Sequence, residues 1–369
     1  MIYLDHAATT PLRKEALDAM MPFFTEKAAN ASALYAAGRQ TRSAIDAARR
    51  QIAQAIGAHE REIYFTAGGS EADNWALFGI ARTMKEKRHI ITTQIEHHAV
   101  LNSCAVLERM GYHVTYIEPD EYGFISPEKV KAAMRPNTGL VSVMTANNEV
   151  GTIEPIAEIA KIAHENGALI HTDAVQAVGH IPIDVEKLDV DLLSMAAHKF
   201  YGPKGIGALY IKNGVHITSL IYGGEQEKGL RAGTENTPAI VGMGQALRLA
   251  CENMPTENAR LEALRNRFEE DILSRIPHAR INGMPNNRLP GTLHVTFPGA
   301  DTNMLLMRLD MEGIAASAGS ACAAGAMERS HVIRAMRVPE GADVRFSLGM
   351  ENTQEDILKT VDALCRILN

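Results

Sequence analysis

Lys199 and Cys322 are the two side chains of this sequence best suited to form a covalent bond with a substrate. Lys199 follows an apolar segment, residues 192–195, and lies among small and aromatic residues. Removing water from an amine in such surroundings lowers its pKa and frees it for Schiff-base chemistry. The alternative is a lysine that extends its ammonium group to solvent. The residues around Lys199 do not decide between the two.

Cys322 differs from the other three cysteines in its neighbours. Cys104, Cys251 and Cys365 lie at helical spacing from leucine or valine residues, so we interpret them as small core residues. Around Cys322, residues 317–325 are only Ser, Ala, Gly and Cys, with no apolar period. This composition is typical of a mobile, solvent-accessible loop, in which a thiol can react. A buried cysteine in tightly packed backbone is the alternative.

The segment Thr66–Glu71 could bind a phosphate group. It reads TAGGSE and lies between an apolar segment and a helix that is expected to begin near Ser70. Glycines allow a ligand close to the backbone, and the N–H groups at a helix start bind anions. The alternative is a tight turn in which Ser70 or Glu71 caps the helix. The segment matches neither the Walker A pattern nor G-x-G-x-x-G.

Asp173 could hold a protonated ring nitrogen. It follows the apolar segment 168–172 directly, and ligands of α/β sheets bind at this end of the strands. A buried aspartate beside a pyridine nitrogen would keep that nitrogen protonated, whereas an aspartate that caps a helix is the alternative interpretation. Residues 147–149, Asn-Asn-Glu, end another such segment and could supply amide hydrogen bonds at the same edge.

The sequence predicts no metal site. The four cysteines are widely scattered and form no C-x-x-C pair, so neither a zinc site nor a thioredoxin-like site is indicated. His97 and His98 are adjacent, but apart from Glu96 they lack cysteine or carboxylate neighbours at the spacing of metal ligands.

Short apolar segments that we interpret as buried strands alternate with helical patterns. The clearest helix spans residues 155–166, with apolar residues at i, i+3, i+4 and i+7 and with Gly167 as its stop. Alternation of apolar strands with helices predicts an α/β fold, with a mainly parallel central sheet and helices on both faces. The expected strands are residues 62–66, 89–93, 140–144, 168–172, 192–195 and 208–211.

The pattern changes after about residue 235. A long helical stretch, residues 238–276, is expected to break near Pro255, and a strand-like segment follows at 291–297. The last helix begins at Thr353, and Asp356 three residues later makes a variant of the capping box. These elements indicate a second, smaller α+β unit.

Length and composition limit the remaining possibilities. At about one domain per ~150 residues, 369 residues predict two domains. We predict a large α/β domain over residues 16–255 and a small α+β domain formed by residues 1–15 and 256–369. A net charge of −7 gives the whole chain no electrostatic reason to bind nucleic acid or an anionic membrane. No 18-residue apolar run and no secretory signal are visible, and the scattered cysteines favour a reducing cytoplasm.

Taken in order, these segments resemble those of the cysteine desulfurases, a branch of the fold-type I pyridoxal-phosphate enzymes. The resemblance covers nearly the whole chain, from YLDHAATTP at residues 3–11 to VRFSLG at residues 344–349. Its most characteristic parts are HKxxGPKG at residues 198–205 and SxGSAC at residues 317–322. The spacing that follows Cys322 is similar to the long form of the family's cysteine loop.

The resemblance implies a role for each matching residue. Lys199 would form the Schiff base with pyridoxal 5'-phosphate and later move protons, while His97 would stack on the cofactor ring and assist proton transfer. Cys322 would attack the sulfur of bound cysteine, and Arg345 would bind the substrate carboxylate, a bidentate task that suits arginine. The other implied residues are Gly69, Ser70 and His198 at the phosphate, Asp173 at the pyridine nitrogen, and Gln176 and Asn148 at the ring hydroxyl and substrate side.

The resemblance also implies the reaction and the partners. L-Cysteine would become L-alanine, and its sulfur would remain as a persulfide on Cys322 for an acceptor protein, either an iron–sulfur scaffold or a thiolation enzyme. Thr234 would reach the cofactor phosphate of a partner subunit, which implies a homodimer.

Three positions depart from the family pattern. Ala196 stands where the family usually has a phosphate-binding serine, Ala197 replaces a glycine, and Tyr35 replaces a histidine near the site entrance. A missing charge-assisted hydrogen bond at residue 196 would cost about 1–3 kcal/mol of cofactor binding.

Two alternative functions remain open from the sequence. A related pyridoxal-phosphate lyase or aminotransferase would need no thiol at residue 322. A non-catalytic sulfur-relay scaffold is the alternative of another class, and the presence of Lys199, Asp173, His97 and Arg345 argues against it.

Overall fold

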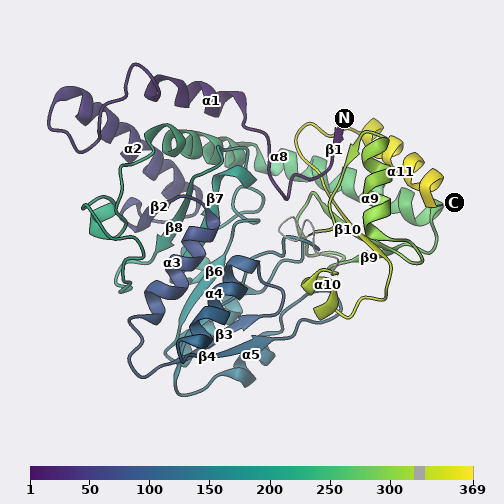
Figure 1. Ribbon diagram of the computed structural model, residues 1–369, viewed down its shortest axis with the longest axis horizontal. Coiled ribbons are helices and arrows are strands. Elements are labelled where there is room, and N and C mark those ends of the chain that lie inside the picture. The colour runs from purple at the N-terminus through teal and green to yellow at the C-terminus, as the bar shows by residue number, and fades with distance from the viewer. Residues whose placement is uncertain (320–328, 369) are drawn as a thin grey trace.

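A computed structural model describes residues 1–319 and 329–368 of the chain (Figure 1). Cys322 lies outside the described residues. The larger part of the molecule is built on a seven-stranded sheet with the strand order β2-β8-β7-β6-β5-β3-β4. Only β8 runs antiparallel to its neighbours, so the prediction of a mainly parallel central sheet is confirmed. The strands are β2 (Ile63–Thr66), β3 (His89–Thr93), β4 (His113–Ile117), β5 (Thr138–Ser142), β6 (Leu169–Asp173), β7 (Leu192–Ala196) and β8 (Gly207–Ile211).

Strand β4 was absent from the expected strands. It lies at the sheet edge, where most of its side chains are only half-buried, and its sequence HVTYI is not a continuous apolar run. An edge strand needs less burial than a central one, so its pattern is weaker.

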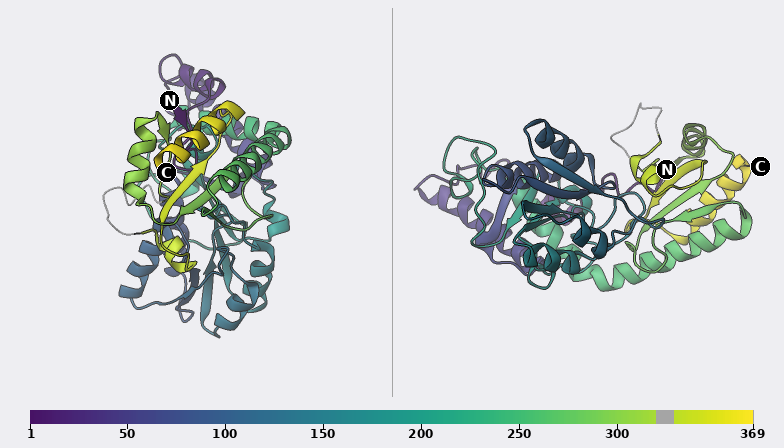
Figure 2. Two further views of the ribbon diagram at one scale, coloured as in Figure 1. Left: turned by 90° about the vertical axis from the view of Figure 1, so that its right-hand side faces the viewer. Right: turned by 90° about the horizontal axis from the view of Figure 1, so that it is seen from below.

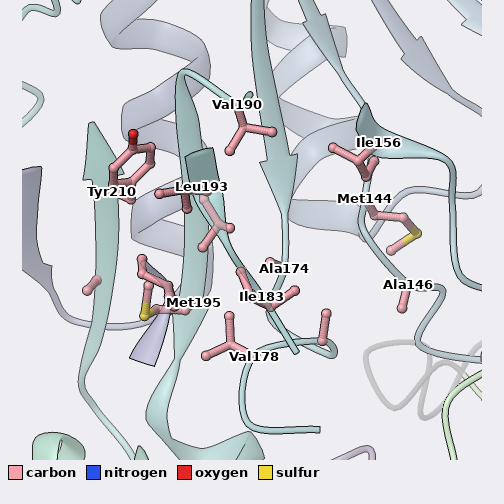
Figure 3. Packing of buried hydrophobic residues seen from close by; sticks show 14 of the residues in the cluster. Met144, Ala146, Ile156, Ala174, Val178, Ile183, Val190, Leu193, Met195 and Tyr210 are labelled. Carbon is pink, nitrogen blue, oxygen red and sulfur yellow. The ribbon is translucent and has the colours of Figure 1, made fainter. Parts of the chain in front are cut away.

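Helices cover both faces of this sheet, because neighbouring residues of each strand point to opposite faces. Ile90 and Leu192 pack beneath α3 and α4, whereas Ile91 and Leu193 belong to the core on the other face. Figure 3 shows part of this second core, with Leu193 and Met195 of β7 beside Tyr210 of β8. The helices of this part are α1 (Lys14–Met20), η1 (Met21–Phe23), α2 (Ala36–Ala55), η2 (Glu60–Glu62), α3 (Gly69–Ala81), α4 (His98–Arg109), α5 (Pro127–Ala133), α6 (Ile156–Glu165), α7 (Val185–Leu188), η3 (Ala197–Lys199) and η4 (Glu227–Gly229).

The smaller part contains an antiparallel sheet with the order β12-β10-β9. Phe268 and Phe346 meet edge to face in its core, with ring centroids 5.0 Å apart. Near the start of the chain β1 pairs in parallel with β11, so the N-terminus lies in this part (Figures 1 and 2). The elements are β1 (Ile2–Tyr3), β9 (Arg280–Asn282), β10 (Thr292–Phe297), α9 (Thr302–Met311), β11 (Ile314–Ala315), α10 (His331–Ala335), β12 (Ala342–Ser347) and α11 (Gln354–Leu368).

Helix α8 (Thr237–Arg275) joins the two parts without the break that we expected at Pro255. Figure 2 shows it running along both parts. Proline removes one backbone hydrogen bond, but packing of Met254 and Leu261 on either side keeps the helix continuous. We still propose the domain boundary between residues 255 and 256, which lies within this helix.

Two local predictions about helix ends are confirmed. Gly167, with φ of +67°, follows the C-cap of α6. Thr353 and Asp356 form the predicted reciprocal cap of α11, with Asp356 Oδ2 accepting from Thr353 N at 2.9 Å and Thr353 Oγ1 accepting from Asp356 N at 3.3 Å. Among the described residues, no helix is both long and apolar enough to cross a membrane.

Candidate active site

Nine of the sequence-predicted site residues line one cavity of about 270 Å³ between the two parts of the molecule. The seven-stranded sheet contributes most of them at the carboxyl ends of its parallel strands, as α/β folds generally do. Arg345 on β12 closes the cavity from the smaller part. The nine are Gly69, Ser70, His97, Asn148, Asp173, Gln176, His198, Lys199 and Arg345.

Lys199 ends the short turn η3, which follows β7 directly. Its Nζ donates hydrogen bonds to the backbone oxygens of Ala7 and Ala8, at 2.6 and 2.9 Å. His180 Nε2 lies 2.8 Å from the Lys199 carbonyl oxygen. The N-terminal segment therefore reaches from the smaller part to the lysine, a contact that the sequence analysis did not predict.

Asp173 is the last residue of β6 and lies on the cavity floor. Its Oδ1 accepts from Val175 N at 2.9 Å. Burial raises the pKa of Asp173 to about 6, while the nearby positive charge of Lys199 lowers it. Gln176 points its amide to the same segment as Lys199, since its Nε2 donates to Ala7 O at 2.9 Å.

His97 is the N-cap of α4 and is held as one tautomer of a neutral ring. Its Nδ1 accepts from Ala99 N at 3.1 Å, so the ring proton lies on Nε2. Burial, assisted by the charge of Lys199, lowers the pKa of His97 to about 4. The same two causes, in the same order, lower the pKa of His198 to about 4. Both imidazoles are therefore uncharged at neutral pH.

The start of α3 forms the part of the cavity wall that we predicted to bind a phosphate. Gly69 is packed so closely that a Cβ on it would lie 2.7 Å from Val175 Cγ2, so this turn requires glycine. The side chains of Ser70 and Glu71 do not cap the helix; Glu71 instead accepts from Ala67 N at 2.9 Å and pairs with Arg231. Ala196 Cβ lies beside this turn, and the alanine supplies no hydroxyl there.

Arg345 is almost fully buried and holds three acceptors. Nη1 donates to Asn148 O at 2.8 Å and to Gly319 O at 2.7 Å, and Nη2 donates to Asp5 Oδ1 at 2.7 Å. Within the described residues, its buried Nε has no hydrogen-bond partner, and Nη2 has a second N–H beyond the one given to Asp5. A carboxylate takes two such parallel donors.

Among the described residues, one predicted site residue, Thr234, is not in the cavity lining. It is exposed on the segment that precedes α8. Cys322 lies outside the described residues. The other three cysteines are in or beside the cores, as expected, and none of them forms a disulfide. Burial raises the pKa of the Cys104 thiol to about 12, so this thiol is unreactive.

The cavity also contains ionisable side chains that the sequence analysis did not assign. Asp73 follows Ser70 by one helical turn on α3, Glu149 follows Asn148, and His331 begins α10. Asp73 could have been found from its i, i+3 spacing to Ser70. Nothing local to His331 pointed to the site, because it reaches the cavity from another part of the chain.

Known proteins resemble this chain over its whole length. The pattern of the class-V aminotransferases matches residues 2–359. A protein named cysteine desulfurase IscS from Clostridium botulinum strain Hall is 51% identical, with 100% of this chain and 94% of the relative covered. An IscS cysteine desulfurase from Methanosarcina thermophila is 50% identical, with coverage of 100% and 92%.

Solved structures agree with these relatives. One described as a NifS-like protein superposes with a TM-score of 0.94 at 37% identity, over 100% of this chain and 99% of the other. A second, described as SspA in complex with cysteine, has a TM-score of 0.84 at 39% identity, over 94% and 99%.

Proposed function

This chain belongs to the class-V aminotransferases and, within them, to the cysteine desulfurases, and on that premise we propose how its own residues perform the reaction. The protein is a desulfurase that converts L-cysteine to L-alanine and transfers the sulfur to a cysteine persulfide. The observation that carries the proposal is the meeting of Lys199, Asp173, His97 and Arg345 around one cavity.

The residues of the cavity fit pyridoxal 5'-phosphate. The backbone N–H groups at the start of α3, with Ser70 and His198, provide an anion site for the phosphate. Asp173 is a buried acid that can pair with a ring nitrogen, and Gln176 and Asn148 can reach the ring hydroxyl and the substrate side. When bound, this cofactor supplies an aldehyde that condenses with amines and a ring that accepts an electron pair from Cα.

Arg345, Lys199 and His97 have different roles in the reaction. Arg345 binds the substrate carboxylate through its remaining donors, and this fixes the orientation of Cα. The Lys199 amine takes the Cα proton, and the neutral His97 assists proton transfer within the cavity. Because both flanking imidazoles are uncharged, the guanidinium of Arg345 is the permanent positive charge of the cavity.

Cys322 carries the sulfur transfer. Its thiolate attacks the substrate sulfur, an S–S bond forms, and the C–S bond breaks. The electron pair of the broken bond stays with Cβ, which takes up a proton, so that alanine is the product. The persulfide then passes its sulfur to an acceptor protein, either an iron–sulfur scaffold or a thiolation enzyme.

The assembly and location that we propose follow from the same residues. We propose a homodimer in which Thr234 of each subunit contacts the cofactor phosphate of the other. The thiol state of Cys104, Cys251 and Cys365 supports a reducing compartment such as the cytoplasm.

One experiment separates this function from its alternatives. Purified protein, pyridoxal 5'-phosphate, L-cysteine and a thiol reductant are combined, and alanine and sulfide are quantified together. We expect equal amounts of both for wild type, the same for the Cys251→Ala control, and neither for Cys322→Ala.

Other outcomes would point elsewhere. Pyruvate and ammonia in place of alanine, with Cys322→Ala still active, would identify a lyase. A protein that never takes up the cofactor would indicate a non-catalytic sulfur relay.

A further inference from the structure

Glu149 is a buried carboxyl group that the proposed reaction does not use. It lines the cavity with no exposed surface, immediately after Asn148. Its Oε2 accepts from Ser330 Oγ at 2.6 Å, whereas its Oε1 has no hydrogen-bond partner in the part of the chain that the structure describes. Gly319 lies against the same carboxyl group, since a Cβ there would be 2.6 Å from Oε2. Glu149 therefore contacts the chain on both sides of residues 320–328.

Two acids lie beside the one guanidinium group that lines this cavity in the described part of the chain. Asp5 forms an ion pair with Arg345 at 2.7 Å. Glu149 lies near enough to Arg345 for that positive charge to lower the pKa of Glu149, against the larger effect of burial. In the proposed function a substrate carboxylate joins this group, so three negative charges would face a single positive one.

Like charges buried together do not all remain ionised. Asp5 is partly exposed and its carboxylate is paired directly with the guanidinium. Glu149 is fully buried, and Ser330 is the one hydrogen-bond donor to its carboxyl group among residues 1–319 and 329–368. Glu149 is thus the acid that becomes neutral most readily when a further negative charge arrives.

The surroundings of Glu149 place this change near neutral pH. Burial raises its pKa to about 7, opposed by the Ser330 hydrogen bond and by Arg345, and Asp343 raises it further. On β12, Asp343 is itself paired with Arg329. The other titratable or charged groups that face this side of the cavity are His331 at the start of α10 and Asp5 in the N-terminal segment.

We propose that Glu149 takes up one proton from solvent when the carboxylate of an amino-acid ligand binds to Arg345. This inference rests on the proposed function, because it requires Arg345 to be the carboxylate site. Because the ligand favours the protonated form, affinity is highest below the pKa of Glu149 in the unliganded protein and falls as pH rises above it. The residue thereby couples substrate and product affinity to pH.

The test measures binding of L-alanine to the holoenzyme from pH 6 to 9 through the absorbance of the bound cofactor. Wild type is compared with Glu149→Gln, which has the same shape and keeps an acceptor for Ser330 but carries no titrating proton. We expect the ratio of the wild-type to the variant dissociation constant to rise about five- to tenfold over this range, as a one-unit rise in pKa on binding requires. Titrations shared by both proteins cancel in the ratio.

Three controls isolate the proposed linkage. Glu154→Gln changes another buried carboxyl group, which is not in the cavity lining. The ratio of the wild-type to the Glu154→Gln dissociation constant for L-alanine should stay constant from pH 6 to 9. Ethylamine lacks a carboxylate. The ratio of its dissociation constants for wild type and Glu149→Gln should therefore be the same at every pH. Ser330→Ala removes a hydrogen bond that lowers the pKa of Glu149, so strong L-alanine binding should persist to higher pH than in wild type.

The outcomes are distinguishable. A constant ratio for Glu149→Gln with L-alanine would overturn the inference while leaving the desulfurase function intact. The same pH-dependent change of this ratio with ethylamine as with L-alanine would also overturn the inference, because proton uptake would then follow from binding of the amine and not of the carboxylate. If wild type takes up no cofactor, the proposed function fails and this inference fails with it.

Discussion

The two walls of the cavity handle buried charge in opposite ways. The wall built on the seven-stranded sheet contains Asp73 and Asp173, with Glu96 behind them, and burial raises the pKa of all three acids. Asp73 and Glu96 each have one carboxyl oxygen that no group of the described chain hydrogen-bonds. The wall built on the three-stranded sheet instead places Arg345 among an ion-pair partner and two carbonyl oxygens.

The difference explains how the two walls are suited to their ligands. Without a guanidinium partner, Asp73 and Glu96 favour the neutral form, whereas Asp173, with a pKa of about 6, stays mostly ionised at neutral pH. The opposite wall keeps a permanent charge, because a guanidinium does not lose its proton in proteins. It can therefore attract an anionic substrate group at any pH, with Glu149 adjusting the local charge. Four predictions test this contrast.

Lys199→Ala should have the largest effect, since it removes the amine that acts as the base. We expect alanine formation to fall by at least about 10³-fold, near the upper range for loss of a positioned base. Product formation over time measures it. Lys187→Ala, an exposed lysine on α7, is the control and should retain wild-type activity. Substantial activity without Lys199 would contradict the assignment.

Arg345→Lys tests the opposite wall. Lysine keeps the charge but loses the planar fork, so Asp5, two carbonyl oxygens and the substrate carboxylate compete for three donors. We expect KM for L-cysteine to rise about 10- to 100-fold, with a smaller change in kcat. Steady-state kinetics measure both constants, and Arg366→Lys at an exposed ion pair is the control. An unchanged KM would show that the carboxylate binds elsewhere.

Glu96→Gln tests whether this buried acid behind the sheet wall is neutral in the folded protein. Burial raises the pKa of Glu96 to about 8, above its usual value of 4.5. The folded protein therefore holds this proton more tightly than the unfolded chain, and the wild-type free energy of unfolding should decrease as pH rises from about 5 to 8. In the variant this decrease should be smaller by a few kcal/mol at most, since each pKa unit corresponds to about 1.4 kcal/mol.

Urea unfolding at several pH values measures this dependence. Glu165→Gln, an exposed glutamate at the end of α6, should follow wild type. The same pH dependence in wild type and Glu96→Gln would mean that Glu96 is charged in the folded protein.

Ala196→Ser is the mildest change, since it adds a hydrogen bond and removes none. A hydroxyl beside the start of α3 would add one charge-assisted hydrogen bond to the cofactor phosphate, worth about 1–3 kcal/mol, so the dissociation constant should fall about 5- to 150-fold. Equilibrium titration with pyridoxal 5'-phosphate measures it, with Ala250→Ser in α8 as the control. Unchanged affinity would show that another group or a water already occupies this place.

Local sequence patterns predicted most of the central sheet and many of the site residues. The apolar segments before Asp173 and Lys199 form strands β6 and β7, and the glycine-rich turn before Ser70 begins α3. Such features are readable because strand burial, glycine turns and helix caps depend on residues within a few positions of each other. Parallel strands then bring their carboxyl ends to one edge, so the residue types at these positions also indicated the chemistry.

The contacts that complete the site are determined by the tertiary structure. Ala7 and Ala8 accept from Lys199 about 190 positions away, Asp5 pairs with Arg345, and Ser330 binds Glu149. No periodicity in the sequence encodes these contacts, because they arise only when the two sheets pack together. Pro255 shows the same limit for the fold, since packing on both sides keeps α8 continuous where the local pattern predicted a break. The sequence by itself determined which groups could react, and the packing of the two parts decided which of them carry charge.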